Sequence, residues 1–317
     1  MTRSVLVYSM GEVIGDGLIK LPFIAGLRAA FPEAKISWCA AKASTVYAGP
    51  LKGVVEGLID EVITDGVMGA GALDVLPWVK PFGGRTFDLV IDTQENVRRS
   101  AVAKRAGRRF VTASGRSKDW PEAVVDRLGA LLAEAEPGAT LRPLTLTNER
   151  ALLAAEALLP RGPTYVGFAP GAGGAEKRWP LERYIELARA QESRGRTPVF
   201  FFGPDEDEDA ARAATAIPDA VFPEDERTDP YTDIKGPLLV IALAGRLAAG
   251  VANDAGPGHM LAAGGAPLLS LQKDRRKAVK FRPAARRLEV LIAEDYGSGM
   301  DALPLDPVTE ALERLLA

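Results

Sequence analysis

The sequence predicts a doubly wound α/β protein built from two halves, and three observations favour this class. The chain has 317 residues, which suits two domains of about 150 residues each better than one ordinary core. Short runs rich in β-branched and aromatic residues alternate with longer segments of helical periodicity along the whole chain. These short runs are apolar throughout, as is typical of parallel strands that are covered on both faces.

The expected strands fall into two equal sets. The first half contains Val5–Ser9, Ile36–Ala40, Ile59–Ile63, Leu89–Asp92 and Arg109–Val111. The second half contains Tyr165–Ala169, Pro198–Phe202, Ala248–Ala252, Leu268–Leu271 and Glu289–Ile292. Helices are expected between the strands, among them Glu149–Leu159, Leu181–Ser193 and Val308–Leu316. Because strand, helix and strand follow one another in both sets, each half is expected to form an open parallel sheet.

Proline and glycine mark the expected boundary between the halves, which lies near Pro143–Pro163, where Leu141-Arg142-Pro143-Leu144 leads into a helix. The helix Glu149–Leu159 is followed by Pro160-Arg161-Gly162-Pro163, which breaks the chain before the next strand begins. The sequence therefore predicts an N-terminal domain of residues 1–155 and a C-terminal domain of residues 156–317.

Composition excludes several classes of protein. Hydrophobic residues make up 47% of the chain and charged residues 26%, as in a globular protein, and the net charge of -3 offers no general attraction to nucleic acid. One cysteine, Cys39, cannot form an internal disulfide, and a single histidine leaves no basis for a zinc site or a serine triad. Neither a signal peptide nor an apolar run of about 18 residues is present, so we expect a cytoplasmic protein.

The segment Val251–Ala263 carries the sharpest functional pattern. An apolar strand ends, Asn253 and Asp254 follow, and Gly256-Pro257-Gly258 opens a helix that carries His259, the only histidine. With proline at the first helical position, the next free N–H groups, on Gly258 and His259, would face an anion such as a diphosphate. A lone histidine is more often structural, but its place in this first turn favours a donor to the phosphate.

A second segment, Ala169–Pro180, joins a strand to a helix through a glycine-rich loop. Glu176 stands where a dinucleotide fingerprint would have its third glycine, and no Gly-Lys-Ser/Thr of a P-loop follows. Two interpretations remain open for its basic end. In the first, Lys177 binds a phosphate through its positive charge. In the second, Lys177 and Arg178 are solvated basic side chains next to Trp179 and Pro180, which pack against the rest of the domain.

Three further segments follow the expected strands. In Ser9–Pro22, Asp16 lies just ahead of a helix, where an aspartate serves as an N-cap or, aimed into a cleft, as a general base. The acidic run Asp205–Asp209 complements a helix dipole, or one of its carboxylates accepts ribose hydroxyls. The polar groups of Asp92–Arg98 offer contacts for an acceptor.

Taken in this order, the segments resemble glycosyltransferase family 9, the ADP-heptose:lipopolysaccharide heptosyltransferase group, over nearly the whole chain. The resemblance rests on Gly15-Asp16 with Leu21-Pro22, Phe87–Asp92 with Gln94, Lys177–Pro180, and Asn253–His259. It implies a GT-B fold, in which two Rossmann-like domains turn their parallel sheets toward a common cleft. The acceptor side would belong to the N-terminal domain and the nucleotide-sugar side to the C-terminal domain.

The resemblance also implies the reaction and its residues. A sugar would pass with inversion, and without a metal, from a nucleotide-diphosphate donor such as ADP-heptose to a lipopolysaccharide-core or other surface-glycan acceptor. The implied catalytic residues are Asp16 as the general base, Lys177 at the diphosphate and His259. The implied donor site comprises Gly171, Lys177, Glu206, Asn253, Asp254, Ala255, Gly256, Pro257, Gly258 and His259. The acceptor side would include Glu12, Gln94, Asn96 and Arg98.

Departures from the family pattern leave alternatives open. The loop before Asp16 is about one residue longer than usual, so Glu12 is a rival for the base, and Ala255 stands where the family usually has a hydroxyl residue. A nucleotide-sugar epimerase or hydrolase, or an inactive nucleotide-sugar-binding relative, would share the diphosphate loop. The reaction would take place at the inner face of the cytoplasmic membrane, and the basic residues of segment 273–280 either contact anionic lipid or form a solvated face, which we favour.

Overall fold

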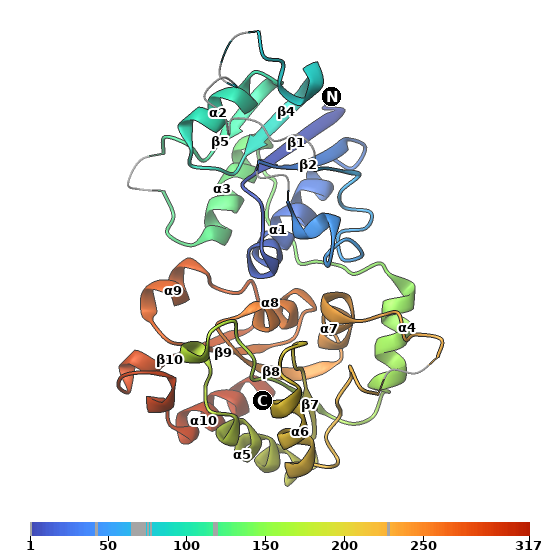
Figure 1. The fold of residues 1–317 in the computed structure, drawn as a ribbon, viewed down its shortest axis with the longest axis vertical. Coiled ribbons are helices and arrows are strands. Elements are labelled where there is room, and N and C mark those ends of the chain that lie inside the picture. Colours follow the sequence, from blue (N-terminus) through green and yellow to red (C-terminus); the bar gives the residue numbers. More distant parts are fainter. Residues whose placement is uncertain are drawn as a thin grey trace. The chain divides into compact units, whose positions relative to one another are not determined.

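Two parallel β-sheets organise the chain, one in each of two compact units, Met1–Thr147 and Asn148–Ala317 (Figure 1). The structure is a computed structural model that describes residues 2–41, 44–64, 74, 76, 78–116, 120–226 and 229–317. The predicted α/β class with parallel sheets is confirmed.

The sheet of the first unit has the strand order β3-β2-β1-β4-β5 among the residues that the structure describes. Its strands are β1 (Ser4–Ser9), β2 (Lys35–Ala40), β3 (Glu61–Ile63), β4 (Phe87–Asp92) and β5 (Gly107–Thr112). The helices of this unit are α1 (Ile14–Ala30), α2 (Val97–Lys104) and α3 (Val124–Ala135), with short 3-10 turns η1 (Val46–Ala48) and η3 (Pro81–Gly84). This order is that of doubly wound nucleotide-binding folds.

The sheet of the second unit has the order β10-β9-β8-β6-β7. Its strands are β6 (Tyr165–Ala169), β7 (Thr197–Phe200), β8 (Leu247–Asn253), β9 (Leu268–Gln272) and β10 (Leu288–Ile292). The helices are α4 (Glu149–Leu158), α5 (Leu181–Glu192), α6 (Asp207–Ala216), α7 (Gly236–Ala244), α8 (Gly256–Ala263), α9 (Arg275–Lys280) and α10 (Leu305–Leu316), with 3-10 turns η4 (Ala175–Lys177), η5 (Ala293–Asp295) and η6 (Met300–Ala302). An isolated parallel bridge from Val221 to Val199 stands beside β7, where the doubly wound order would place one more strand.

All the expected strands are present, with ends that differ by a few residues. A strand end differs by up to two residues, as at β3, which begins at Glu61 instead of Ile59, and at β7, which ends at Phe200 instead of Phe202. The apolar runs predicted the strands well because most of these strands are buried along nearly their whole length, as β1 and β6 are.

Helix α4 lies at the start of the second unit instead of across the expected boundary at residue 155. The division between the units falls before it, between Thr147 and Asn148. Asn148 caps α4 by accepting a hydrogen bond from the Ala151 N–H at 2.9 Å, and α4 contacts α7. The proline and glycine signal at residues 160–163 therefore marks the end of this helix.

Helix α1 begins earlier than the sequence suggests. Its first residue is Ile14 and its N-cap position is Val13, which offers no side-chain hydrogen bond. Asp16 consequently lies inside the first helical turn instead of ahead of the helix, and the N-cap interpretation of this residue is wrong.

The second unit has a large aromatic core beneath its sheet. Trp179 is 1% exposed, donates its indole N–H to the Leu303 carbonyl at 2.9 Å, and packs edge-on against the Tyr184 ring.

Across the described parts of the chain, none of the helices combines the length and the hydropathy that crossing a bilayer demands.

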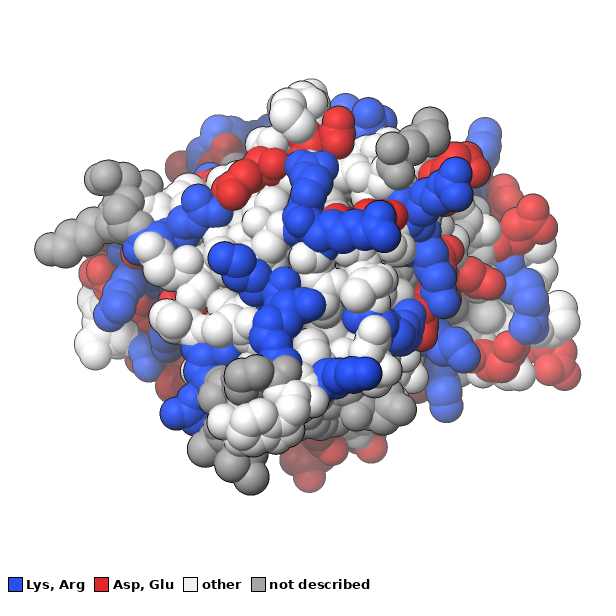
Figure 2. Space-filling view, turned by 90° about the horizontal axis from the view of Figure 1, so that it is seen from above, with Lys and Arg blue, Asp and Glu red and all other residues white. Residues whose placement is uncertain are grey.

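Charged side chains cover the amino end of the first sheet. Figure 2 looks down on this end from above the view of Figure 1 and shows many Lys and Arg side chains with acidic ones among them. Glu61 pairs with Lys35 at 2.9 Å and with Arg85 at 2.7 Å, and Asp88 pairs with Arg108 at 3.5 Å. The residues predicted for the site follow the opposite, carboxyl ends of the strands.

Candidate functional site

The predicted site residues cluster where open α/β sheets bind ligands. In such sheets the ligand lies outside the carboxyl ends of the strands where the strand order reverses. These strands are β1 and β4 in the first unit and β6 and β8 in the second. Four of the polar segments that the sequence singles out lie at the carboxyl ends of these four strands, namely Ser9–Asp16, Asp92–Arg98, Pro170–Lys177 and Asn253–His259.

Asn253, the last residue of β8, joins both ends of the glycine-rich loop. It is 1% exposed. Its Nδ2 donates to the Pro170 carbonyl at 2.6 Å, and its Oδ1 accepts from the Trp179 N–H at 3.1 Å. A buried amide with these two bonds fixes where the loop leaves β6 and where it enters α5. The sequence identified Asn253 as a donor-site residue, and the structure adds this anchoring role.

Lys177, Asp254 and His259 come together beside that anchor. The Lys177 ammonium nitrogen lies 3.5 Å from a carboxylate oxygen of Asp254, whose own N–H donates to the Leu271 carbonyl at 3.0 Å. His259 is buried at 7% exposure. Burial lowers its pKa from 6.5 to about 4, although the charge of Asp254 acts in the opposite direction. At neutral pH the imidazole is therefore neutral, and it can offer a hydrogen bond but no positive charge.

Helix α8 begins without a side-chain cap. It starts at Gly256, so Pro257 occupies the second helical position instead of the first, and the N-cap residue is Ala255, which has no polar side chain. The amides of Gly256 and Gly258 belong to the turn whose N–H groups lack helical partners. The expectation that the His259 amide is free is wrong, because it stands four residues after Ala255, where the helical bonds begin. An uncapped start of this kind is suited to an anion.

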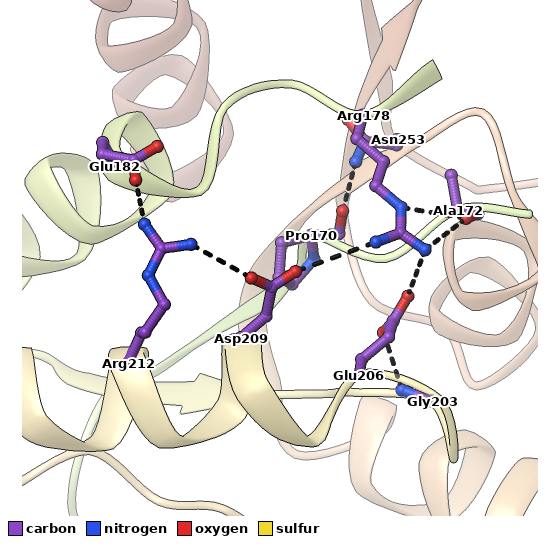
Figure 3. Close-up of polar contacts among 9 residues, drawn as sticks. All are labelled: Pro170, Ala172, Arg178, Glu182, Gly203, Glu206, Asp209, Arg212 and Asn253. Atoms are coloured by element: carbon purple, nitrogen blue, oxygen red, sulfur yellow. Dashed lines mark hydrogen bonds and ion pairs between the residues drawn. The ribbon is translucent and has the colours of Figure 1, made fainter. Parts of the chain in front are cut away.

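Glu206 and Arg178 link the glycine loop to the segment that follows β7 (Figure 3). One Glu206 oxygen accepts from the Gly203 N–H at 2.7 Å, and the other lies 3.4 Å from the Arg178 guanidinium. Gly171 approaches Glu206 so closely that a Cβ there would stand 2.2 Å from the carboxylate. The acidic run after β7 thus supplies a loop contact at Glu206 and acidic residues in the first turn of α6.

In the first unit, Glu12 is buried and paired. One of its oxygens accepts from the Ser9 hydroxyl at 2.5 Å and from the Lys20 ammonium at 2.8 Å. Burial alone would raise its pKa, but the charge and hydrogen bond of Lys20, followed by the bond from Ser9, lower the pKa below its ordinary value. Lys20, one turn after Asp16 on α1, is a partner that sequence reasoning missed.

Asp16 differs from Glu12 in every one of these respects. It is exposed in the first turn of α1, and no hydrogen bond or ion pair reaches its carboxylate from the described residues. Its charge is felt at the neighbouring Tyr47, whose pKa is raised mainly by burial and further by Glu12 and Asp16. The two candidate bases therefore lie near the same tyrosine, one free and one held.

The segment after β4 combines structural and exposed groups. Asp92 is fully buried and accepts from the Ser100 hydroxyl and from the Thr112 hydroxyl at 2.9 Å, and burial raises its pKa. Asn96 caps α2 by accepting from the Arg99 N–H at 3.2 Å, and Gln94 is 4% exposed. Of the expected acceptor-side residues here, Asn96 and Arg98 are both exposed, and Arg98 forms no ion pair with the described residues.

The sequence patterns did not predict the contacts that Arg178 and Asp92 make in the structure. Arg178 stands beside Lys177 in the motif Lys177–Pro180, but a basic pair alone does not say which of the two side chains points into the unit.

Among the described residues, no cluster of three or more His, Cys, Asp or Glu side chains is arranged to hold a metal ion.

Solved structures share the fold of this chain. A glycosyl transferase of family 9 from Veillonella parvula superposes with a TM-score of 0.70 at 20% identity, covering 99% of this chain and 97% of that one. The Escherichia coli ADP-heptose lps heptosyltransferase II gives 0.66 at 20% identity, covering 99% and 98%. The E. coli heptosyltransferase WaaC with ADP gives 0.66 at 17% identity, covering 98% and 99%. These likenesses show the GT-B fold.

Sequence comparison supplies the family. No curated protein sequence matches the chain. The sequence model described as "Glycosyltransferase family 9 (heptosyltransferase)" matches residues 77–301, more than half of the chain. The matched range contains the glycine loop and the segment Asn253–His259, and it begins after Glu12 and Asp16. The chain belongs to glycosyltransferase family 9 and is an enzyme of that family.

Proposed function

We propose that this enzyme transfers a sugar, with ADP-heptose as the first candidate donor, to a hydroxyl of a lipopolysaccharide-core or related surface-glycan acceptor at the inner face of the cytoplasmic membrane. Support for the donor comes from relatives that share the fold, one of which was solved with ADP and with ADP-2-deoxy-2-fluoro heptose. The observation that carries the proposal is the meeting of Lys177, Asp254 and His259 beside the uncapped start of α8.

The donor diphosphate would bind at that meeting point. Lys177 supplies a positive charge, and the Gly256 and Gly258 amides supply hydrogen bonds at the positive end of the α8 dipole. Neutral His259 adds a hydrogen bond and not a second charge. These groups stabilise the negative charge that builds up on the departing diphosphate, so the proposed step needs no metal ion.

The acceptor would be activated by Asp16. A general base must accept a proton from the attacking hydroxyl while its carboxylate is within reach of substrate. Asp16, which is exposed and has no partner among the described residues, meets this requirement. Glu12 is buried against Lys20 and Ser9, and its lowered pKa makes it a weaker base. We therefore assign the proton transfer to Asp16 and give Glu12 the task of holding Lys20.

In the proposed reaction, the acceptor oxygen attacks the anomeric carbon as its proton passes to Asp16. The bond from that carbon to the diphosphate oxygen breaks in the same step, so the configuration at the anomeric carbon inverts. The diphosphate leaves with both bonding electrons, and its negative charge is stabilised by Lys177 and by the amides at the start of α8. Gln94, Asn96 and Arg98 are the proposed acceptor contacts, and of these Asn96 and Arg98 are exposed.

The test begins with donor identity. Calorimetry with a panel of nucleoside diphosphates and nucleotide sugars is expected to show tight binding of one nucleotide class, followed by transfer when a glycan acceptor is added. Donor conversion without any acceptor would support an epimerase or hydrolase instead. Donor binding with no acceptor ever modified would support an inactive relative, and a panel without any binding would refute the donor site.

A further inference from the structure

We propose that Arg178 is a positioning residue for the donor diphosphate, acting with Glu206 to hold the glycine loop where Lys177 faces Asp254. The inference rests on the proposed function, because it concerns the same diphosphate. It differs from the role expected for Glu206, which was a direct contact to the ribose.

The Arg178 side chain folds back onto its own loop. Its Nε and one terminal nitrogen, Nη2, both donate to the Ala172 carbonyl, at 3.1 and 3.0 Å (Figure 3). These two bonds close the loop across Gly173 and Gly174, whose backbones are the most permissive in this stretch. A loop with several glycines loses much conformational entropy on becoming ordered, so such a bond is needed to keep the neighbouring Lys177 in one place.

The same guanidinium reaches the neighbouring segment of the unit. Its Nη2 lies 3.4 Å from Glu206 and its Nη1 lies 3.7 Å from Asp209 in the first turn of α6. The Glu206 side chain is 10% exposed, and its other oxygen accepts a hydrogen bond from the Gly203 N–H in the segment after β7. Both Glu206 oxygens are thus engaged by the protein, and the carboxylate is fixed before any ligand arrives.

The loop is therefore held from two directions. Asn253 fixes its ends against β8, and Arg178 fixes its middle against Glu206 after β7. The close approach of Gly171 to the Glu206 carboxylate is an independent sign of the second contact, since any side chain at position 171 would displace Glu206. Lys177 belongs to the loop that Asn253 and Arg178 hold in place, and it is adjacent to Arg178 in the sequence. The position of the Lys177 ammonium group therefore depends on both sets of contacts.

The two roles of Glu206 make different predictions. A ribose contact serves a nucleoside monophosphate and a nucleoside diphosphate alike. Positioning of Lys177 favours the ligand that carries the additional phosphate. The ratio of the two affinities is a readout that general loss of structure would not change selectively.

The experiment measures binding of ADP and AMP, or of the nucleotide pair that the panel selects, to Arg178→Ala. The expected result is a loss of about tenfold in affinity for the diphosphate, equivalent to about 1.4 kcal/mol, with the monophosphate affinity within about twofold of wild type. In turnover, the KM for the donor should rise more than kcat falls. Arg178→Lys should restore part of the loss, because it keeps the charge and loses the planar fork.

Two further variants sharpen the test. Arg212→Ala is the matched control, because Arg212 ends the same network with bonds to Glu182 and, at 3.2 Å, to Asp209, and it should bind both nucleotides as wild type does. Arg178→Ala and Glu206→Ala should each weaken diphosphate binding, and the double variant should be little worse than either single one.

Several outcomes would overturn the proposal. Wild-type diphosphate affinity in a folded Arg178→Ala protein would refute the positioning role alone, as would equal losses for both nucleotides. Additive losses in the double variant would separate Arg178 from Glu206 and so also refute the pairing. Failure of the wild-type protein to bind any nucleoside diphosphate would refute the proposed function itself, which is a different result.

Discussion

Burial decides what His259 would contribute at the proposed diphosphate site. The imidazole is 7% exposed and its pKa falls to about 4, so the side chain would meet a diphosphate there as a neutral hydrogen-bonding group. The positive charge must then come from Lys177 and from the helix start. This division of tasks follows from desolvation, which the position of a histidine in the sequence does not reveal.

The same pKa makes a prediction about stability. His259 is the only histidine in the chain. Between about pH 6.5 and pH 5 its imidazole becomes protonated in the unfolded state but stays neutral in the folded state, where its pKa is about 4. The free energy of unfolding should therefore fall as the pH falls through this range, with a slope approaching about 1.4 kcal/mol per pH unit. Urea unfolding of wild type and His259→Gln at several pH values measures this slope, and the variant should show a much flatter profile. Parallel profiles would contradict the buried, neutral histidine.

At the scale of elements, the glycine loop shows what sequence patterns can and cannot give. Its place between β6 and α5 was predicted, because an apolar run, a glycine cluster and a proline start signal are local features. Its anchors were not, since Asn253 lies far along the chain and Glu206 belongs to a run of five acidic residues with similar local surroundings. Contacts between distant segments depend on the order of the strands in the sheet, which no local pattern records.

The helix starts show the same limit on a smaller scale. Helices α1 and α8 both begin ahead of the residue that the sequence suggested, because neither uses a capping side chain that would mark the position. At α1 this difference changes the interpretation of Asp16 from a cap to an exposed carboxylate. At α8 it assigns the free amides to Gly256 and Gly258.

The anchor at Asn253 can be tested through stability and binding together. Asn253→Ala leaves the Pro170 carbonyl and the buried Trp179 N–H without their partner, so the free energy of unfolding should fall by about 2 to 4 kcal/mol. The disordered loop should also weaken diphosphate binding. Asn148→Ala is the control, because it removes the side-chain cap of α4 and should cost about 1 kcal/mol without affecting the nucleotide. Equal effects of the two variants on binding would contradict the anchoring role.

At the scale of the whole molecule, the division into two units assigns α4 to the second. The Arg246 side chain donates to the Leu159 carbonyl just after α4, and the helix buries Ala151, Ala154 and Ala155. A cut at the boundary expected from sequence would pass through this packing. The hydrophobic pattern predicted the helix itself but could not say with which sheet it packs.

A fragment of residues 148–317 should therefore fold by itself and bind the donor nucleotide with an affinity close to that of the full chain. A fragment of residues 156–317 should unfold at a lower temperature, because the surface of α7 that α4 contacts would be exposed. Thermal unfolding and calorimetry of both fragments check this. Equal midpoints, or no nucleotide binding by the longer fragment, would contradict the assignment of α4 and of the donor site to the second unit.

Asp16→Asn provides the most direct measurement of the central claim, which places the general base in the first unit and the diphosphate site in the second. The account predicts that turnover falls by at least about a hundredfold, while calorimetry shows donor affinity within about twofold of wild type. Glu12→Gln makes the same carboxylate-to-amide change at the rival base. The folded fraction of this variant should retain far more turnover than Asp16→Asn. Wild-type-like turnover of Asp16→Asn would contradict the account, and so would a loss of donor affinity as large as the loss of rate.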